Sequence, residues 1–183
     1  MPRGLSPVLT PADLSWVELQ AARLDGDVYE LAGAYCLLGE LEGPRHRARA
    51  VLAERSPRLI AESSTAAWIW GACAEPARLR FAVSPDARAR LSPAMGIVVR
   101  EIVYADGDLT AVDAFTVTTP LRTALDLARE GDLVDDLDQT VARLADIAGF
   151  DLADCLASLG SRAGILSRTT TEERLRRALA TTR

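Results

Sequence analysis

The residues best suited to chemistry are two threonines and an arginine in the segment "FTVTTPLRTALDLARE". Thr118 and Thr119 precede Pro120, and Arg122 follows two residues later. In a helix that begins at Pro120, the N-terminal amides, the two hydroxyls and the guanidinium would all be close to one point. Phosphate, or another anion, is the ligand that such a group of donors suits.

The helix itself is predicted by apolar residues at i, i+3, i+4 and i+7, which are Leu121, Ala124, Leu125 and Ala128. Thr119 is a natural N-cap, and Gly131 stands where the helix should end. Arg122 is then near the third helical position, where a cation opposes the helix dipole at a cost of about 0.3–1 kcal/mol. A negative group is therefore expected close to Arg122.

Two sources of that negative group remain open. The first is a bound phosphorylated ligand, which would make the chain a small phosphate- or nucleotide-binding enzyme or sensor. The second is internal: Arg122 is buried and pairs either with Asp126, one turn along the helix, or with Glu101 from a strand. Arginines near strand ends commonly join a sheet to a helix in this way.

Several other chemistries are excluded by residue types. All 21 basic residues are arginine, so the lysine of a P-loop, a Schiff-base enzyme or a lysine-dependent nuclease is missing. His46 is the only histidine, and Cys36, Cys73 and Cys155 are too far apart for a zinc pair. We expect no catalytic residue, no metal and no cofactor.

An acidic run near the start of the last third is a further candidate for metal binding. It comprises Asp132, Asp135, Asp136 and Asp138. Calcium loops require a spacing such as D-x-D-x-D-G, which this run lacks. Acids that precede or begin a helix also stabilise its dipole, and this interpretation is favoured.

Charge and hydropathy indicate a soluble globular protein. The chain has 183 residues, is 49% apolar and carries a net charge of −5. Binding to nucleic acid would therefore need a local patch, and Arg45, Arg47 and Arg49 form the best one, although they also suit a solvated helix face. No run is long enough for a membrane span, and the N-terminus lacks a signal-peptide core, so a cytoplasmic location without membrane contact is expected.

The pattern of elements predicts an α/β (α+β) fold with a small mixed or antiparallel sheet flanked by helices. Residues 1–41 read as a helix from Thr10 and a hairpin around Ala32-Gly33, residues 42–130 as an α/β core domain, and residues 131–183 as a helical subdomain packed on it. The helix and hairpin together are typical of the last part of a winged helix, without the two helices that should precede it.

A short apolar segment, "SSTAAWIWGA", predicts a turn of helix capped at Ser64 or Thr65 that ends at Gly71. It carries Trp68 and Trp70. Exposed tryptophans can stack on bases, but two of them among alanines and an isoleucine more often anchor a core. Thr65, Trp68 and Gly71 are therefore assigned to a core motif.

The segments "TAAWIWGA", "VVREIV" and "VTTPLRTALDLAR", in this order after a helix and hairpin, resemble the AbiEi antitoxins of type IV toxin-antitoxin systems. The resemblance runs from about Leu14 to Arg129. The last segment carries it most specifically. The lysine-free, Ala- and Arg-rich usage is similar to that of forms common in GC-rich actinobacteria.

What the resemblance implies is a non-catalytic protein that binds promoter DNA through a winged helix, represses its own operon and opposes a nucleotidyltransferase-like toxin. Two departures stand out. The expected recognition helix carries Asp13 and Glu18 against a lone Arg23, so its winged helix is degenerate. The nuclease domain that related chains append is also not expected here, in agreement with the missing lysine.

Overall fold

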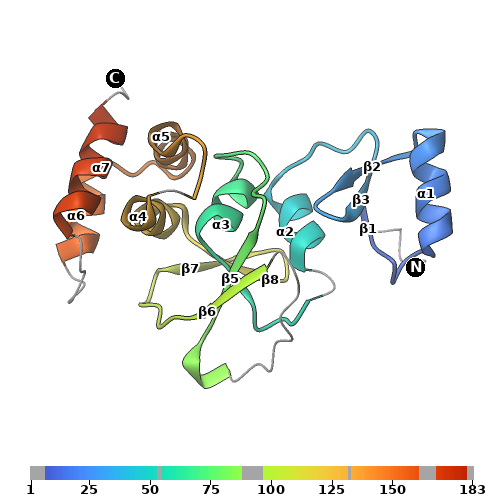
Figure 1. Cartoon of the computed structure of the whole chain (residues 1–183), viewed down its shortest axis with the longest axis horizontal. Helices are drawn as coiled ribbons and strands as arrows, with labels where there is room; N and C mark the ends of the chain where they lie inside the picture. The colour runs from blue at the N-terminus through green and yellow to red at the C-terminus, as the bar shows by residue number, and fades with distance from the viewer. Residues whose placement is uncertain (1–6, 53–54, 88–96, 132, 161–167, 181–183) are drawn as a thin grey trace.

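The computed structural model describes residues 7–52, 55–87, 97–131, 133–160 and 168–180, and it is a mixed α+β structure, as predicted. Figure 1 shows three parts along the longest axis: a small sheet with an outer helix at the N-terminal end, a larger sheet in the middle, and a group of helices at the C-terminal end. Whether these parts coincide with the predicted domains 1–41, 42–130 and 131–183 stays a prediction.

The N-terminal part contains β1 (Val8–Leu9), α1 (Trp16–Asp25), β2 (Val28–Leu31) and β3 (Ala34–Leu37). The three strands are antiparallel, in the order β1-β3-β2. The predicted hairpin is confirmed, because Leu31 pairs with Ala34 around a turn in which Ala32 and Gly33 both have positive φ. The short strand β1 was not predicted.

Helix α1 begins later than predicted, at Trp16 instead of just after Thr10. The reason is local. Thr10 binds the Asp13 carboxylate and closes a separate turn, while Ser15 and Glu18 form a complete capping box five residues further on. The helix consequently buries Leu19, whereas Val17 is 71% exposed.

The central sheet contains five strands: β4 (Ile60–Ala61), β5 (Leu79–Val83), β6 (Ile97–Glu101), β7 (Leu109–Val112) and β8 (Phe115–Thr118). Their order is β6-β5-β4-β8-β7. The sheet is mixed, since β4 is parallel to β8 and β5 to β6, while the other pairs are antiparallel. Helices α2 (Pro44–Leu52) and α3 (Ser63–Trp70) belong to this part, and a 3-10 turn, η1 (Pro85–Ala87), follows β5.

One apolar cluster joins the N-terminal sheet to the central one. Its fully buried members come from both sheets and from α2: Val8 and Cys36 of the small sheet, Val51 of α2, and Phe81 and Val117 of the large sheet. Helix α2 thus lies between the two sheets, as Figure 1 shows. The burial of Phe81 alone is worth about 2–3 kcal/mol by its apolar area.

The C-terminal part consists of helices α4 (Pro120–Glu130), α5 (Leu137–Ala148), α6 (Leu152–Gly160) and α7 (Arg168–Ala180). Their shared core includes the fully buried Leu127, Leu144, Leu159 and Leu175. Ala67 of α3 joins the same core, so α3 and α4 form the boundary between sheet and helices. Among the described residues, none of the helices is long and apolar enough to span a bilayer.

Candidate functional site

Helix α4 has the predicted bounds, and its first turn holds Arg122 in a buried position. Thr119 is the N-cap, and Pro120 opens the helix. Arg122 is only 6% exposed. Its Nη1 lies 2.6 Å from the Asp108 carboxylate and its Nε 2.8 Å from that of Asp126. The guanidinium also stacks on the Tyr104 ring, 4.8 Å from the ring centre.

The negative charge that the position of Arg122 requires is thus supplied in this structure by two carboxylates of the chain. Burial by itself would lower the pKa of Arg122, but hydrogen bonding to Asp126 and the charges of Asp126 and Asp108 outweigh it and raise the pKa. Of the two acids named from the sequence, Asp126 is a partner. Glu101 lies instead at the exposed end of β6.

Asp108 was not anticipated, although a signal for it exists. It follows the Asp106-Gly107 turn and directly precedes β7. Because Leu109 pairs with Thr118, Asp108 stands opposite Thr119 at the start of α4, where its carbonyl accepts a hydrogen bond from the Thr119 amide at 2.8 Å. The register of the β7–β8 hairpin, had it been known, would have predicted that Asp108 lies beside the start of α4.

The threonines beside Arg122 bind their own chain. The Thr118 hydroxyl is fully buried and lies 2.8 Å from the Thr123 hydroxyl. The Thr119 hydroxyl accepts from the Arg122 amide and donates to the carbonyl of Gly107, both at 3.4 Å. These contacts stabilise the turn from β8 into α4. Anion binding by Thr118, Thr119 and Arg122 stays a prediction.

The ion pairs of Arg122 with Asp108 and Asp126 belong to a larger set of charged contacts, which we term the α4 ion network. It consists of four arginines, four acids and one tyrosine: Arg80, Arg100, Arg122, Arg129, Glu62, Asp108, Asp126, Glu130 and Tyr104. Arg129 continues it from Asp126, at 3.3 Å, to Glu130, at 3.4 Å. Arg80 and Arg100 each reach Glu130 at 2.7 Å.

Glu62 closes the far end of the α4 ion network. It is fully buried, directly after β4, and accepts two hydrogen bonds from Arg100 at 2.8 and 2.9 Å. The hydroxyl of Tyr104 donates to it at 3.2 Å. Burial, together with the charge of Glu62, raises the pKa of Tyr104, so this hydroxyl keeps its proton. The network therefore connects α4 to β5 and β6 and to the residues that adjoin β4 and β7.

The predicted core motif lies against the arginine patch. The Thr65 hydroxyl accepts the amide of Arg80 at 2.7 Å, and Trp68 is buried beneath the guanidinium of Arg47. Gly71 ends α3 with a φ of 86°, and a Cβ there would lie 2.8 Å from Nη1 of Arg47. Arg47 thus packs on the C-terminal turn of α3.

The predicted cap of α3 is wrong. The helix begins at Ser63 after Glu62, and no side chain caps it. The Thr65 hydroxyl accepts the amide of Arg80 instead, and the Glu62 carboxylate is held by Arg100. A local cap motif was thus overridden by contacts to distant strands.

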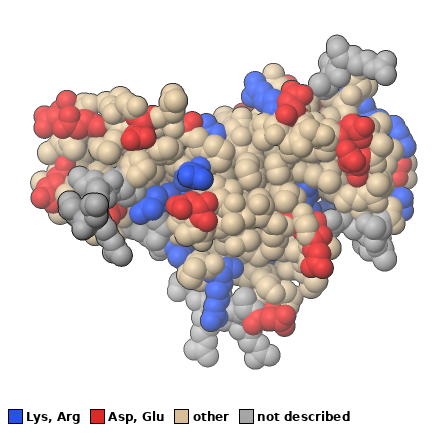
Figure 2. All heavy atoms as spheres, turned by 180° about the vertical axis from the view of Figure 1, so that it is seen from behind, with Lys and Arg blue, Asp and Glu red and all other residues tan. Residues whose placement is uncertain are grey.

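The three arginines of α2 differ in their surroundings. Arg47 binds Glu42 at 2.6 Å and donates to the carbonyl of Trp68 at 3.1 Å. Arg49 lies 3.9 Å from Asp113, and Arg45 is exposed. On the face in Figure 2, acidic side chains lie close to basic ones. Nucleic-acid binding by Arg45, Arg47 and Arg49 stays a prediction.

Residues 59–179 match the family model described as the AbiEi antitoxin C-terminal domain. The chain belongs to the AbiEi antitoxin family. No curated protein matches it. Among solved structures, the AbiEi-family chain is similar to the RV2827C protein from Mycobacterium tuberculosis, with 19% identity and a TM-score of 0.40, over 96% of this chain and 76% of that one.

The matched range begins just before β4 and ends in the last turn of α7. It includes the whole α4 ion network and the Thr65, Trp68 and Gly71 motif, while α1, the three-stranded sheet and α2 precede it. The α4 ion network and the motif thus belong to the AbiEi domain itself, whereas Arg45, Arg47 and Arg49 lie outside the matched range. Within the described residues, no group of three or more His, Cys, Asp or Glu side chains is arranged to hold a metal ion.

Proposed function

We propose that this AbiEi-family protein is a non-catalytic antitoxin that acts by binding a nucleotidyltransferase-like toxin. The observation that carries the proposal is the family match over residues 59–179. The state of the reactive groups supports it. Arg122 and Thr118 are held by internal partners, and burial raises the pKa of Cys73 to about 11 and that of Cys155 to about 12, which keeps both thiols protonated.

Co-expression tests the antitoxin role. The product of the neighbouring reading frame, induced alone, is expected to stop growth, and induction of this chain beside it should restore growth. Because neutralisation works by binding, the two proteins should also co-purify. Growth arrest that persists beside soluble, folded antitoxin, with no co-purification, would contradict the proposal.

Binding to its own promoter is the regulatory arm of the proposal, and α2 supports it. Arg45 is exposed. Arg49, one turn further along α2, is partly exposed and lies 3.9 Å from the Asp113 carboxylate. Helix α1 is poorly suited to phosphate, because Glu18 and Asp25 flank its single basic residue, Arg23. We therefore assign the contact to Arg45 and Arg49 instead of to α1.

A gel shift with the promoter fragment checks this arm. Two phosphate contacts predict that the affinity falls about tenfold between 50 and 200 mM salt. The variant Arg45→Ala/Arg49→Ala should lose most of this salt dependence, whereas Arg168→Ala/Arg176→Ala, on the distant helix α7, should keep it. A wild-type protein that gives no shift at low salt, or a double variant that binds as tightly as wild type, would remove DNA from the proposal.

A further inference from the structure

Helix α1 carries an apolar surface on its solvent side as well as on the side of its own sheet. Leu19 is fully buried against the three-stranded sheet. Trp16, Val17 and Leu24 are instead 64%, 71% and 84% exposed. They are three of the seven large hydrophobic side chains that are exposed in the part of the chain that the structure describes, so apolar exposure is concentrated on this one helix.

The helical period places these residues on one face. At 3.6 residues per turn, four apolar side chains of α1 fall within an arc of about 140°, on the side away from Leu19: Trp16, Val17, Ala21 and Leu24. Gln20 is the one polar residue within this arc, and its side-chain amide donates to the hydroxyl of Tyr35 in the sheet. The outer face of α1 is therefore apolar.

No element of the described chain covers this outer face. In Figure 1, α1 is the outermost helix at the N-terminal end, and the three strands lie on its inner side. The exposed fractions of Trp16 and Leu24 agree with that position. The outer face of α1 is thus open to another molecule.

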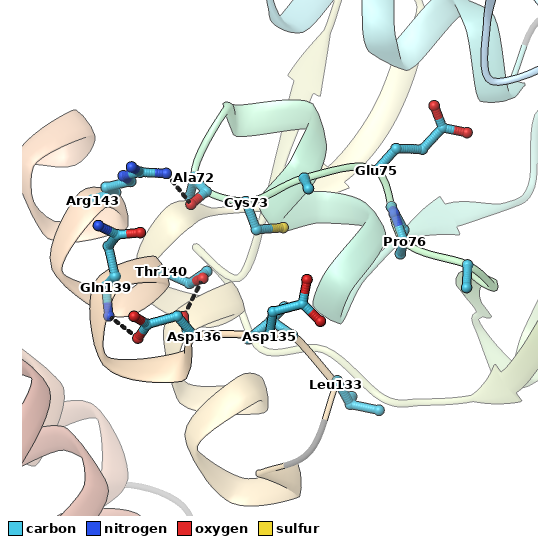
Figure 3. Close-up of a pocket in the computed structure, with 13 residues that line it drawn as sticks. Ala72, Cys73, Glu75, Pro76, Leu133, Asp135, Asp136, Gln139, Thr140 and Arg143 are labelled. Atoms are coloured by element: carbon cyan, nitrogen blue, oxygen red, sulfur yellow. Dashed lines mark hydrogen bonds between the residues drawn. The ribbon is translucent and has the colours of Figure 1, made fainter.

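The pocket of about 510 Å³ behind α3, drawn in Figure 3, differs from this face. In it, the Asp136 carboxylate accepts the amide of Gln139 at 2.9 Å, and Arg143 donates to the carbonyl of Ala72 at 3.4 Å. None of the buried side-chain polar atoms that lack a partner in the described residues belongs to its lining. Its charged groups therefore either stabilise the fold or stay in solvent.

The two edges of the outer face of α1 carry opposite charges. Glu18 and Asp25 lie along one edge, and Arg23 lies along the other. All three side chains are exposed. Phosphate or an anionic lipid headgroup would meet two carboxylates at the first edge. A protein surface that is apolar in the middle, with one basic and one acidic edge, is complementary to this face.

We propose that the outer face of α1 binds the same face of a second copy of this chain, with the two helices parallel about a two-fold axis. Such an axis runs along the helices and brings the Arg23 edge of each copy to the Asp25 edge of the other. An antiparallel pair would instead bring like edges together. The second copy supplies both the apolar face and the matching edges, and the inference does not rest on the proposed antitoxin role.

The size of the face sets the strength of the dimer. A helix of 10 residues is about 15 Å long. One face of it buries less than the roughly 800 Å² per partner of a standard interface. We therefore expect a weak dimer, with a dissociation constant on the order of 10–100 µM.

Sedimentation velocity of the whole chain, from about 5 to about 500 µM, tests the dimer across the expected constant. Wild type should change from monomer to dimer, and Val17→Asp/Leu24→Asp should stay monomeric. The matched control is Leu38→Asp/Leu41→Asp, which replaces two exposed leucines outside α1 and should dimerise as wild type does. All four side chains are exposed, so the circular dichroism of both variants should equal that of wild type.

Two results would overturn the proposal. The first is a wild-type chain that remains monomeric at about 500 µM, including one that binds phosphatidylglycerol vesicles through α1, since the face would then serve a lipid surface. The second is an equal loss of dimer in the α1 variant and in the control, because added negative charge alone would then explain it.

Charge variants test the parallel arrangement. Arg23→Glu and Asp25→Arg each place like charges on facing edges of a parallel pair, so each should weaken the dimer by about 3- to 10-fold. Arg23→Glu/Asp25→Arg exchanges the edges and should bind more tightly than either single variant. In an antiparallel pair, Asp25→Arg would face Glu18 of the other copy. A tighter dimer from Asp25→Arg alone would therefore overturn the proposed arrangement.

Discussion

Replacement of Arg122 by alanine is expected to lower the free energy of unfolding by about 3–5 kcal/mol, the usual cost of removing one partner from a buried ion pair. The variant removes the guanidinium that lies against the buried carboxylates of Asp108 and Asp126. It also removes the stacking on Tyr104. Urea unfolding followed by circular dichroism measures the change, since the loss should move the midpoint without altering the slope.

Arg129→Ala is the matched control, because Arg129 binds the same Asp126 carboxylate at 3.3 Å but is itself 35% exposed. Because Arg129 is partly exposed and Asp126 keeps Arg122, this variant should cost about 1 kcal/mol or less. Similar losses in both variants would show that burial does not decide the effect. A loss at Arg122 below about 1 kcal/mol would mean that its two ion pairs hold the fold no more tightly than surface pairs.

The elements that the sequence predicted well are those set by neighbouring residues. Helix α4 begins and ends where Thr119, Pro120 and Gly131 indicate, since a cap, a first-turn proline and a terminal glycine act within a few residues. Helix α1 was misplaced for a related reason. Two local start signals, at Thr10 and Ser15, compete there, and the complete capping box at Ser15 forms the helix.

The contacts of the site could be predicted only where the two residues are close together in the sequence. Asp126 is four residues from Arg122 and was named as a partner. Glu62 and Arg100 are 38 residues apart, and Arg80 and Glu130 are 50 apart, so their pairing depends on the order of the strands. Residue spacing carries no information on that order.

The arginine patch on α2 also shows that residue spacing alone does not reveal contacts between distant segments. Arg45, Arg47 and Arg49 look alike in the sequence, since each is separated from the next by one residue. In the structure Arg47 packs on Trp68, and its Nη1 lies 2.8 Å from the position that a Cβ of residue 71 would take. The sequence assigned Trp68 and Gly71 to a core motif and Arg47 to a separate basic patch. In the structure these three residues lie against one another.

A second large effect is expected at the end of α4, where Gly131→Ala should cost about 2–4 kcal/mol in unfolding free energy. Gly131 has a φ of 91° and a ψ of −61°, a conformation that alanine adopts only under strain. An added Cβ would also lie 2.6–2.7 Å from the guanidinium of Arg174. That guanidinium donates to the carbonyls of Ala128 and Arg129 at 2.9 and 3.3 Å, so its displacement removes two hydrogen bonds between α7 and the last turn of α4.

Two comparisons divide this cost into its parts. Gly149→Ala replaces another helix-ending glycine, with a φ of 71° and open space around its Cβ, and should cost only about 1–2 kcal/mol from backbone strain. In an Arg174→Ala background the clash at Gly131 is gone, so Gly131→Ala should cost less there than in wild type. Thermal unfolding of the four proteins of this double-mutant cycle gives the coupling directly. A cost at Gly131 that is unchanged by removal of Arg174 would show that α7 is not held to α4 through this contact.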